Sequence, residues 1–215
     1  MYTQASTHFL RNVVKPSTRD RIVAGAVRVF SEKGISDVVV ADVLLASDVS
    51  RRTFYKHFRS AEDVLRAVYE SVTADLIQAV TGTIRDETDP LKQIVGAADA
   101  YLKHVVDNGQ LIIALHAEAI RPGSALGPRR EETLDAIEQG IDDAVAKALG
   151  KRIEPLVYRG LLTAVEGLVI HVRKEGAFTE DDRQRVLAVA GPIWINVLAG
   201  YENLPTRDDA SAQSS

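Results

Sequence analysis

The chain has 215 residues, of which 46% are hydrophobic, and a net charge of −4. This composition is typical of a soluble globular protein, and the absence of cysteine excludes disulfides, zinc ribbons and thiol nucleophiles. By inspection, no apolar run approaches the roughly 18 residues of a membrane span, and the first 20 residues lack the pattern of a signal peptide. We therefore expect a cytoplasmic protein that does not enter a membrane.

The charge is distributed unevenly along the chain. Residues 1–66 carry 11 Lys and Arg against 7 Asp and Glu, a net of +4, whereas residues 67–215 carry 15 against 23, a net of −8. Within the first part, residues 49–59 contain four basic residues and no acid. A local basic patch of this kind favours contact with phosphate groups.

Signals for helix starts and stops follow one another after residue 17. Ser17 and Asp20 form a capping box before an apolar stripe that ends at Gly34. Residues 38–40 have the propensity of a strand, but a short helix fits the apolar spacing at least as well. Ser50 caps a third helix that is expected to run to residue 58. We expect an all-α protein of about nine helices, with later starts at Ser60, Asp89, Pro128, Pro155 and Thr179.

The second and third predicted helices, joined by about three residues, form a helix-turn-helix, whose second helix lies in the major groove of DNA. Arg51 and Arg52 occupy the first turn of that helix, where the helix dipole disfavours cations, so they indicate a partner. Because two phenylalanines of the same helix turn inward, Tyr55 and Lys56 join the arginines on the opposite side. This face offers donors for guanine and phosphate; the alternative is a solvated basic face.

The most specific part of the sequence is the segment at 49–58, which reads Val-Ser-Arg-Arg-Thr-Phe-Tyr-Lys-His-Phe. Together with residues 42–48 it resembles the TetR/AcrR family of regulators. Residues before and after match in character, so the resemblance covers about 17–70, and beyond this it rests on helix count and length. It implies an N-terminal three-helix helix-turn-helix domain followed by a C-terminal helical ligand-binding and dimerisation domain. The domain ranges that follow are a flexible tail at 1–16, the DNA-binding domain at 17–60, the ligand-binding and dimerisation domain at 61–202 and a flexible tail at 203–215.

The resemblance also implies which side chains meet DNA. The first turn of the third helix would approach bases or nearby phosphates, and the residues after it would mainly hold the backbone. For Thr53 the alternative is an ordinary surface position, and for His57 a packed histidine at a helix end. The predicted DNA-binding residues are Ser50, Arg51, Arg52, Thr53, Tyr55, Lys56 and His57.

Three features depart from the family pattern. Val38 and Val39 stand where threonines often begin the second helix, so a hydroxyl contact to phosphate is lost. Asp48 replaces the usual glycine of the turn; it tolerates the left-handed conformation but adds a negative charge near DNA. Ala61 replaces a common lysine. The affinity for DNA is therefore expected to depend more on the third helix.

Two C-terminal helices carry the features of a dimer interface. Small residues on the helix at 156–174 recur at spacings of four and three and allow another helix to approach closely. The helix at 182–201 is more apolar than one packed face requires. We expect a four-helix bundle across a two-fold axis, as in the family; the alternative is that both are core helices of a monomer. The predicted interface residues are Gly160, Ala164, Gly167, Ile193, Trp194 and Val197.

Polar residues on the body helices are candidates for a ligand pocket, although each is also explained as a satisfied or surface polar group. They are Tyr101, His104, His116, Tyr158, Glu166 and His171. The five histidines lack the spacing of a metal site, and no cofactor motif is present, so we expect neither metal nor cofactor.

These features favour a transcriptional regulator over an enzyme. The expected protein is a repressor that binds a palindromic operator in double-stranded DNA as a homodimer and is released by a small-molecule effector. The alternative is a helical enzyme or small-molecule carrier whose head has lost DNA binding, motivated by the three departures. No nucleophile, base and orienting residue can be assembled from the sequence.

Overall fold

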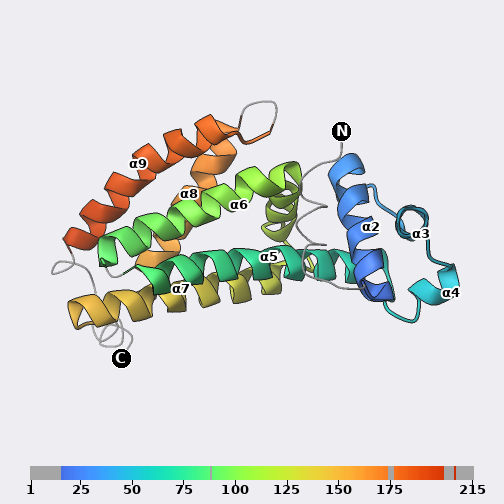
Figure 1. The fold of residues 1–215 in the computed structure, drawn as a ribbon, viewed down its shortest axis with the longest axis horizontal. Helices are drawn as coiled ribbons and strands as arrows, with labels where there is room; N and C mark the ends of the chain where they lie inside the picture. Colours follow the sequence, from blue (N-terminus) through green and yellow to red (C-terminus); the bar gives the residue numbers. More distant parts are fainter. Residues whose placement is uncertain (1–15, 88, 174–176, 201–205, 207–215) are drawn as a thin grey trace. The chain divides into compact units, whose positions relative to one another are not determined.

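A computed structural model describes residues 16–87, 89–173, 177–200 and 206. These residues form eight helices and no strand, with one isolated β-bridge between Ile153 and Thr206, which confirms the all-α prediction (Figure 1). The predicted tails at 1–16 and 203–215 lie almost wholly outside the described residues. The helices are α2 (Thr18–Lys33), α3 (Val40–Ser47), α4 (Arg51–Phe54), α5 (Ala61–Asp86), α6 (Pro90–Ala119), α7 (Gly127–Leu149), α8 (Pro155–Val172) and α9 (Glu180–Ala199).

Gly109 interrupts α6. Its φ of 55° and ψ of −134° are not helical, and this conformation is open almost only to glycine because a Cβ would clash there. The interruption divides α6 into two segments, so the eight helices of the described residues contain nine helical segments, in agreement with a prediction of about nine.

The chain divides into two compact units. The first comprises the chain up to Ala74 together with Asp107–Glu131, and the second comprises Asp75–Val106 together with the chain from Glu132 onward. The predicted domain boundary at residue 60 separates the head from α5, whereas the first compact unit continues through the first half of that helix.

The helix α2 forms for the local reasons that the sequence suggested. The Ser17 hydroxyl accepts a hydrogen bond from the Asp20 amide at 3.2 Å, and the Asp20 carboxylate accepts one from the Ser17 amide at 3.0 Å. The helix ends at Gly34, whose φ is 81°. Its buried side packs on α3 so closely that a Cβ added to Gly25 would lie 2.9 Å from the Cβ of Ser47.

In the second unit, α8 is more apolar than the sequence analysis suggested. Its 18 residues have a mean hydropathy of 1.3, so the helix is long and apolar enough to cross a membrane by length and composition alone. The helix also carries Arg159, Glu166 and His171, and only 17% of it is buried in the single chain. An apolar helix in a multimer shows the same pattern when a partner covers it, so its composition is weak evidence for a membrane.

Candidate nucleic-acid interface

The turn between α3 and α4 is held in a left-handed conformation at Asp48. Its φ and ψ are both 51°, and it is the one non-glycine residue with a positive φ among the described parts of the chain. The Asp48 amide donates to the carbonyl of Leu44, and the Val49 amide donates to the same oxygen at 3.4 Å. Aspartate is one of the few residues that adopt this conformation at low cost, so the turn forms without the family's glycine.

Two arginines of α2 also contact this turn. A guanidinium nitrogen of Arg21 donates to the carbonyls of Ser47 at 3.2 Å and Asp48 at 2.9 Å, and Arg28 donates to the carbonyl of Ala46. Sequence reasoning missed both residues. The signal available was their spacing of seven, which places them on one face of α2.

The helix α4 is shorter than predicted. Its Ser50 cap accepts a hydrogen bond from the Thr53 amide at 3.1 Å, as expected, but the α-helix ends at Phe54 and not at residue 58. From there the backbone continues as turns: the Lys56 amide donates to the Thr53 carbonyl at 3.2 Å and the His57 amide to the Phe54 carbonyl at 2.9 Å. Such bonds from residue i to i−3 tighten the chain, which ends the regular helix.

The inward side of this segment is aromatic. Phe54 is fully buried and Phe58 nearly so, with ring centroids 6.0 Å apart, as the sequence spacing predicted. The guanidinium of Arg19 lies over the Phe58 ring, 5.2 Å from its centroid, in a cation–π contact that the sequence did not suggest. The contact with Arg19 links the α4 segment to α2.

The outward side carries the predicted DNA-binding residues. Arg51, Arg52, Lys56 and His57 are exposed, and Tyr55 is 49% exposed. Ser50 is exposed, but its hydroxyl already lies 2.9 Å from that of the half-buried Thr53 and serves as the helix cap. The structure therefore brings the predicted residues onto one short segment and divides them into exposed side chains and cap residues. We call Arg51, Arg52, Tyr55, Lys56 and His57 the α4 face.

Other side chains cap α3 and α5 where the sequence departs from the family pattern. Val38 is buried, whereas Val39 is 57% exposed and brings no hydroxyl. The Asp42 carboxylate accepts a hydrogen bond from the Val39 amide at 3.1 Å and another from the Lys33 ammonium at 2.6 Å. The hydrogen bond from Lys33 holds the pKa of the Asp42 carboxyl below its usual value. Ala61 begins α5, where the cap is provided by the Ser60 hydroxyl.

The predicted interface residues of α8 lie on its exposed surface. Gly160, Ala164 and Gly167 are exposed, and a Cβ added to either glycine would meet no atom within 4 Å. Leu156 and Ile170 extend the line, with 73% and 47% of their surface exposed. We call these five residues the α8 stripe.

The predicted residues of α9 differ from one another. Ile193 is 50% exposed, together with Val189 at 51%, and Val197 is half-buried. Trp194 is only 3% exposed, so its predicted place at an interface is corrected: the side chain packs inside the single chain. A rotation of 100° per residue puts Ile193 and Trp194 on different sides of the helix.

The candidate ligand residues do not lie together in one unit. His116 belongs to the first unit and the other five to the second. Tyr158 and His104 are buried, Tyr101, His116 and Glu166 are half-buried, and His171 is exposed. The hydroxyl of Tyr158 donates to the buried carboxylate of Asp142 at 3.2 Å, so this tyrosine has a structural partner.

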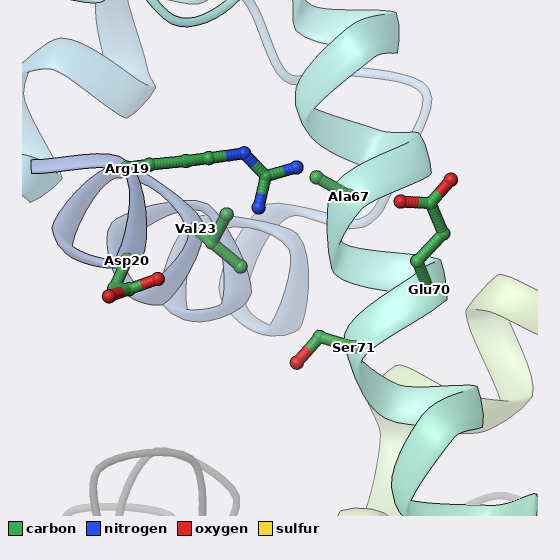
Figure 2. Close-up of a pocket in the computed structure, with 6 residues that line it drawn as sticks. All are labelled: Arg19, Asp20, Val23, Ala67, Glu70 and Ser71. Carbon is green, nitrogen blue, oxygen red and sulfur yellow. The ribbon is translucent and has the colours of Figure 1, made fainter. Parts of the chain in front are cut away.

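One hollow in the first unit has a volume of about 310 Å³ and lies between α2 and α5 (Figure 2). None of the six candidate ligand residues lines it. Figure 2 shows Arg19 extending from α2 toward α5, and Glu70, which pairs with Arg129 at 3.1 Å, at the other side. The lining residues are Arg19, Asp20, Val23, Ala67, Glu70 and Ser71.

Comparison with known proteins gives matches in sequence and in fold. The family described as "Bacterial regulatory proteins, tetR family" matches residues 22–68. The HTH-type transcriptional regulator SrpR of Pseudomonas putida is 25% identical over 181 residues, which cover 82% of this chain and 84% of that protein. The HTH-type transcriptional repressor DhaR of Mycobacterium sp. (strain GP1) is 30% identical over 78 residues, which span 36% of this chain and 39% of the relative's own length.

Solved structures share the fold over most of the chain. The fatty acid degradation regulator FadR from Bacillus halodurans has a TM-score of 0.67 at 18% identity, covering 87% of this chain and 98% of that chain. A transcriptional regulator from Rhodococcus sp. Rha1 has a TM-score of 0.66 at 18% identity, covering 84% and 97%. The head of this chain therefore matches the tetR family of bacterial regulatory proteins, the longer chain is similar in sequence to HTH-type transcriptional regulators, and the helical fold is shared with solved structures of such regulators.

Proposed function

We propose that the protein is a cytoplasmic repressor that binds a palindromic operator as a homodimer and leaves it when a small-molecule effector binds. The observation that carries the proposal is the α4 face, which presents two arginines, a lysine, a tyrosine and a histidine beside a capped turn. Arginine forks can bind guanine edges in the major groove, and lysine, tyrosine and histidine can donate to phosphates. The proposed role of the protein is regulatory and not catalytic, like that of the regulators that the chain resembles.

The α8 stripe supports the homodimer. Two large apolar side chains, Leu156 at 73% and Ile170 at 47% exposed, flank two exposed glycines in this stripe. Glycine in a helix interior costs about 1 kcal/mol relative to alanine, which an approaching helix backbone can offset. Val189 and Ile193 of α9 add apolar surface, so one patch on each copy would form a self-complementary interface.

A change on the α4 face tests DNA binding. The probe is a double-stranded fragment enriched from a randomised pool by the wild-type protein. We expect Arg52→Ala with Tyr55→Ala to abolish retention at moderate salt while the dimer stays intact. Lys147→Ala, which removes an exposed cation of α7, is the matched control and should bind like the wild type. Unchanged retention by the double variant would refute the proposed interface.

Salt dependence provides a second readout of the same interface. Each phosphate contact that is lost should reduce the slope of log affinity against log salt by about 0.9. Lys56→Ala is therefore expected to reduce this slope by about one unit while preserving the preferred sequence. A loss of sequence preference without a change in slope would show that Lys56 reads a base instead.

A change on the α8 stripe tests the dimer. Gly167→Arg places a charged side chain where the partner helix is proposed to approach, so sedimentation should show a monomer. Ala136→Arg, at an exposed position of α7, is the control and should leave the mass unchanged. A Gly167→Arg protein that still sediments as a dimer would place the interface elsewhere.

The effector is tested with a metabolite library. A compound that raises the thermal unfolding midpoint of the protein and also releases the selected DNA fragment supports ligand-controlled repression. Compounds that stabilise the protein without changing DNA retention would contradict control by that ligand.

A further inference from the structure

The end of α3 is held by an arginine pair of α2. Arg21 donates to the carbonyls of Ser47 and Asp48 at 3.2 and 2.9 Å, and Arg28 donates to that of Ala46. Three consecutive carbonyls at a helix C-terminus therefore receive charged donors from a helix 18 to 27 residues earlier in the chain. The last carbonyls of a helix lack intrahelical partners and carry the negative end of its dipole, so cations are favoured there.

The geometry of Arg21 suits this task better than a lysine would. One guanidinium nitrogen is shared between two carbonyls of successive residues, which restrains the peptide unit where the chain turns. The guanidinium is planar and presents several donors in a fixed arrangement, whereas an ammonium is a compact point charge. The turn that it restrains sets the direction in which α4 leaves α3.

Arg21 also lies close to the negative charge of the Asp48 side chain. The Asp48 side chain is fully exposed, and its carboxylate lies 4.0 Å from the Arg21 guanidinium. Two residues later Ser50 caps α4, so this carboxylate is close in sequence to the α4 face. A phosphate backbone that approaches α4 would be repelled by Asp48 unless a nearby cation offsets its charge.

We propose that Arg21 is a positioning residue for DNA recognition: it fixes the turn between α3 and α4 through the Ser47 and Asp48 carbonyls and offsets the Asp48 charge. The inference rests on the proposed contact between the α4 face and DNA. It predicts that Arg21 and Asp48 are coupled in DNA affinity, and not only in folding. Arg28 holds the preceding carbonyl, and among the described residues it has no acidic side chain as a partner.

The test is a double-mutant cycle on full-length protein with Arg21→Met, Asp48→Asn and both changes together. Asparagine tolerates the left-handed conformation, so Asp48→Asn removes charge without straining the turn. We expect Arg21→Met to weaken binding to the selected DNA fragment about fivefold, and Asp48→Asn to recover most of that loss in the Arg21→Met background. In the wild-type background Asp48→Asn should change affinity less than about twofold. Arg66→Met, which removes a cation of α5 with no contact to the turn, is the control for net charge.

Three outcomes overturn the inference. The first is that Arg21→Met binds DNA like the wild type. The second is that Asp48→Asn improves binding equally in both backgrounds, and the third is that Arg66→Met weakens binding as much as Arg21→Met. If Arg21→Met does not fold, Arg21→Lys takes its place in the cycle and must show the same coupling with a smaller loss. Failure of the proposed function is distinct, because then the Arg52→Ala and Tyr55→Ala double variant would also retain DNA.

Discussion

Gly25 is the position where α2 and α3 approach most closely, and replacing it with alanine should weaken the head. A Cβ at this position would lie 2.9 Å from both the Cβ and the amide nitrogen of Ser47, and 3.0 Å from its Cα. Two of these atoms belong to the backbone, so α3 must move as a whole. Overpacking costs about 1–3 kcal/mol, and contact with backbone places this site near the upper value.

Helix propensity partly opposes that cost. Alanine is favoured over glycine in a helix by about 1 kcal/mol, so the net loss for Gly25→Ala is about 2 kcal/mol. For a chain of this length such a loss lowers the unfolding midpoint by roughly 4–8 °C. The control is Gly82→Ala in α5, where the nearest atom to a new Cβ is the flexible end of Arg85 at 3.9 Å. This variant should be as stable as the wild type or more stable.

The assays are thermal unfolding and urea unfolding, both followed by far-ultraviolet circular dichroism, with DNA retention measured in parallel. The chain has two compact units, which can unfold in separate transitions. In that case Gly25→Ala should lower the midpoint of the transition that includes the head and leave the midpoint of the other transition unaltered. A Gly25→Ala protein that matches or exceeds the stability of the wild type would refute the close approach of α2 and α3.

Three further predictions concern stability. Tyr158→Phe removes the hydroxyl that donates to the buried Asp142 carboxylate, so the free energy of unfolding should fall by about 1–3 kcal/mol in urea titration; no change would show that the bond contributes nothing. The hydrogen bonds from Arg183 lower the pKa of Glu180 to about 2. The stabilisation from this depressed pKa is present above the ordinary value near 4.5 and is lost as the pH falls toward 2, so carboxyl NMR titration of Arg183→Met should show the pKa of Glu180 rising toward 4.5. Ser17→Ala removes the N-cap of α2 and should cost about 1 kcal/mol in the same urea assay, whereas Ser17→Asn should keep most of the stability.

The candidate site was predictable where its signals were local. The segment at 49–58 predicted an exposed basic face and two inward phenylalanines, because residues four apart share one side of a helix. The early end of α4 at Phe54 was not predicted. Periodicity does not distinguish a regular helix from a tightened turn, such as the one in which the Lys56 and His57 amides bond to carbonyls three residues back.

The ligand site was the least predictable part. The polar candidates came from helices far apart in sequence, and periodicity shows which side of its own helix a residue occupies but not which other side chain it meets. Tyr158 illustrates this limit, since its hydroxyl is used by Asp142, sixteen residues earlier on α7.

The sequence by itself determined the helical class, the cap at Ser17 and the exposed basic side of the segment at 49–58, because capping, periodicity and motif spacing act over a few residues of chain. Tertiary structure decided which predicted interface residues are available. Trp194 is buried in the single chain while its neighbour Ile193 is half exposed, because neighbouring helices cover one side of α9 and not the other. It also decided the contacts of Arg21, whose carbonyl partners lie 26 and 27 residues away and become neighbours only when α2 packs against the turn after α3.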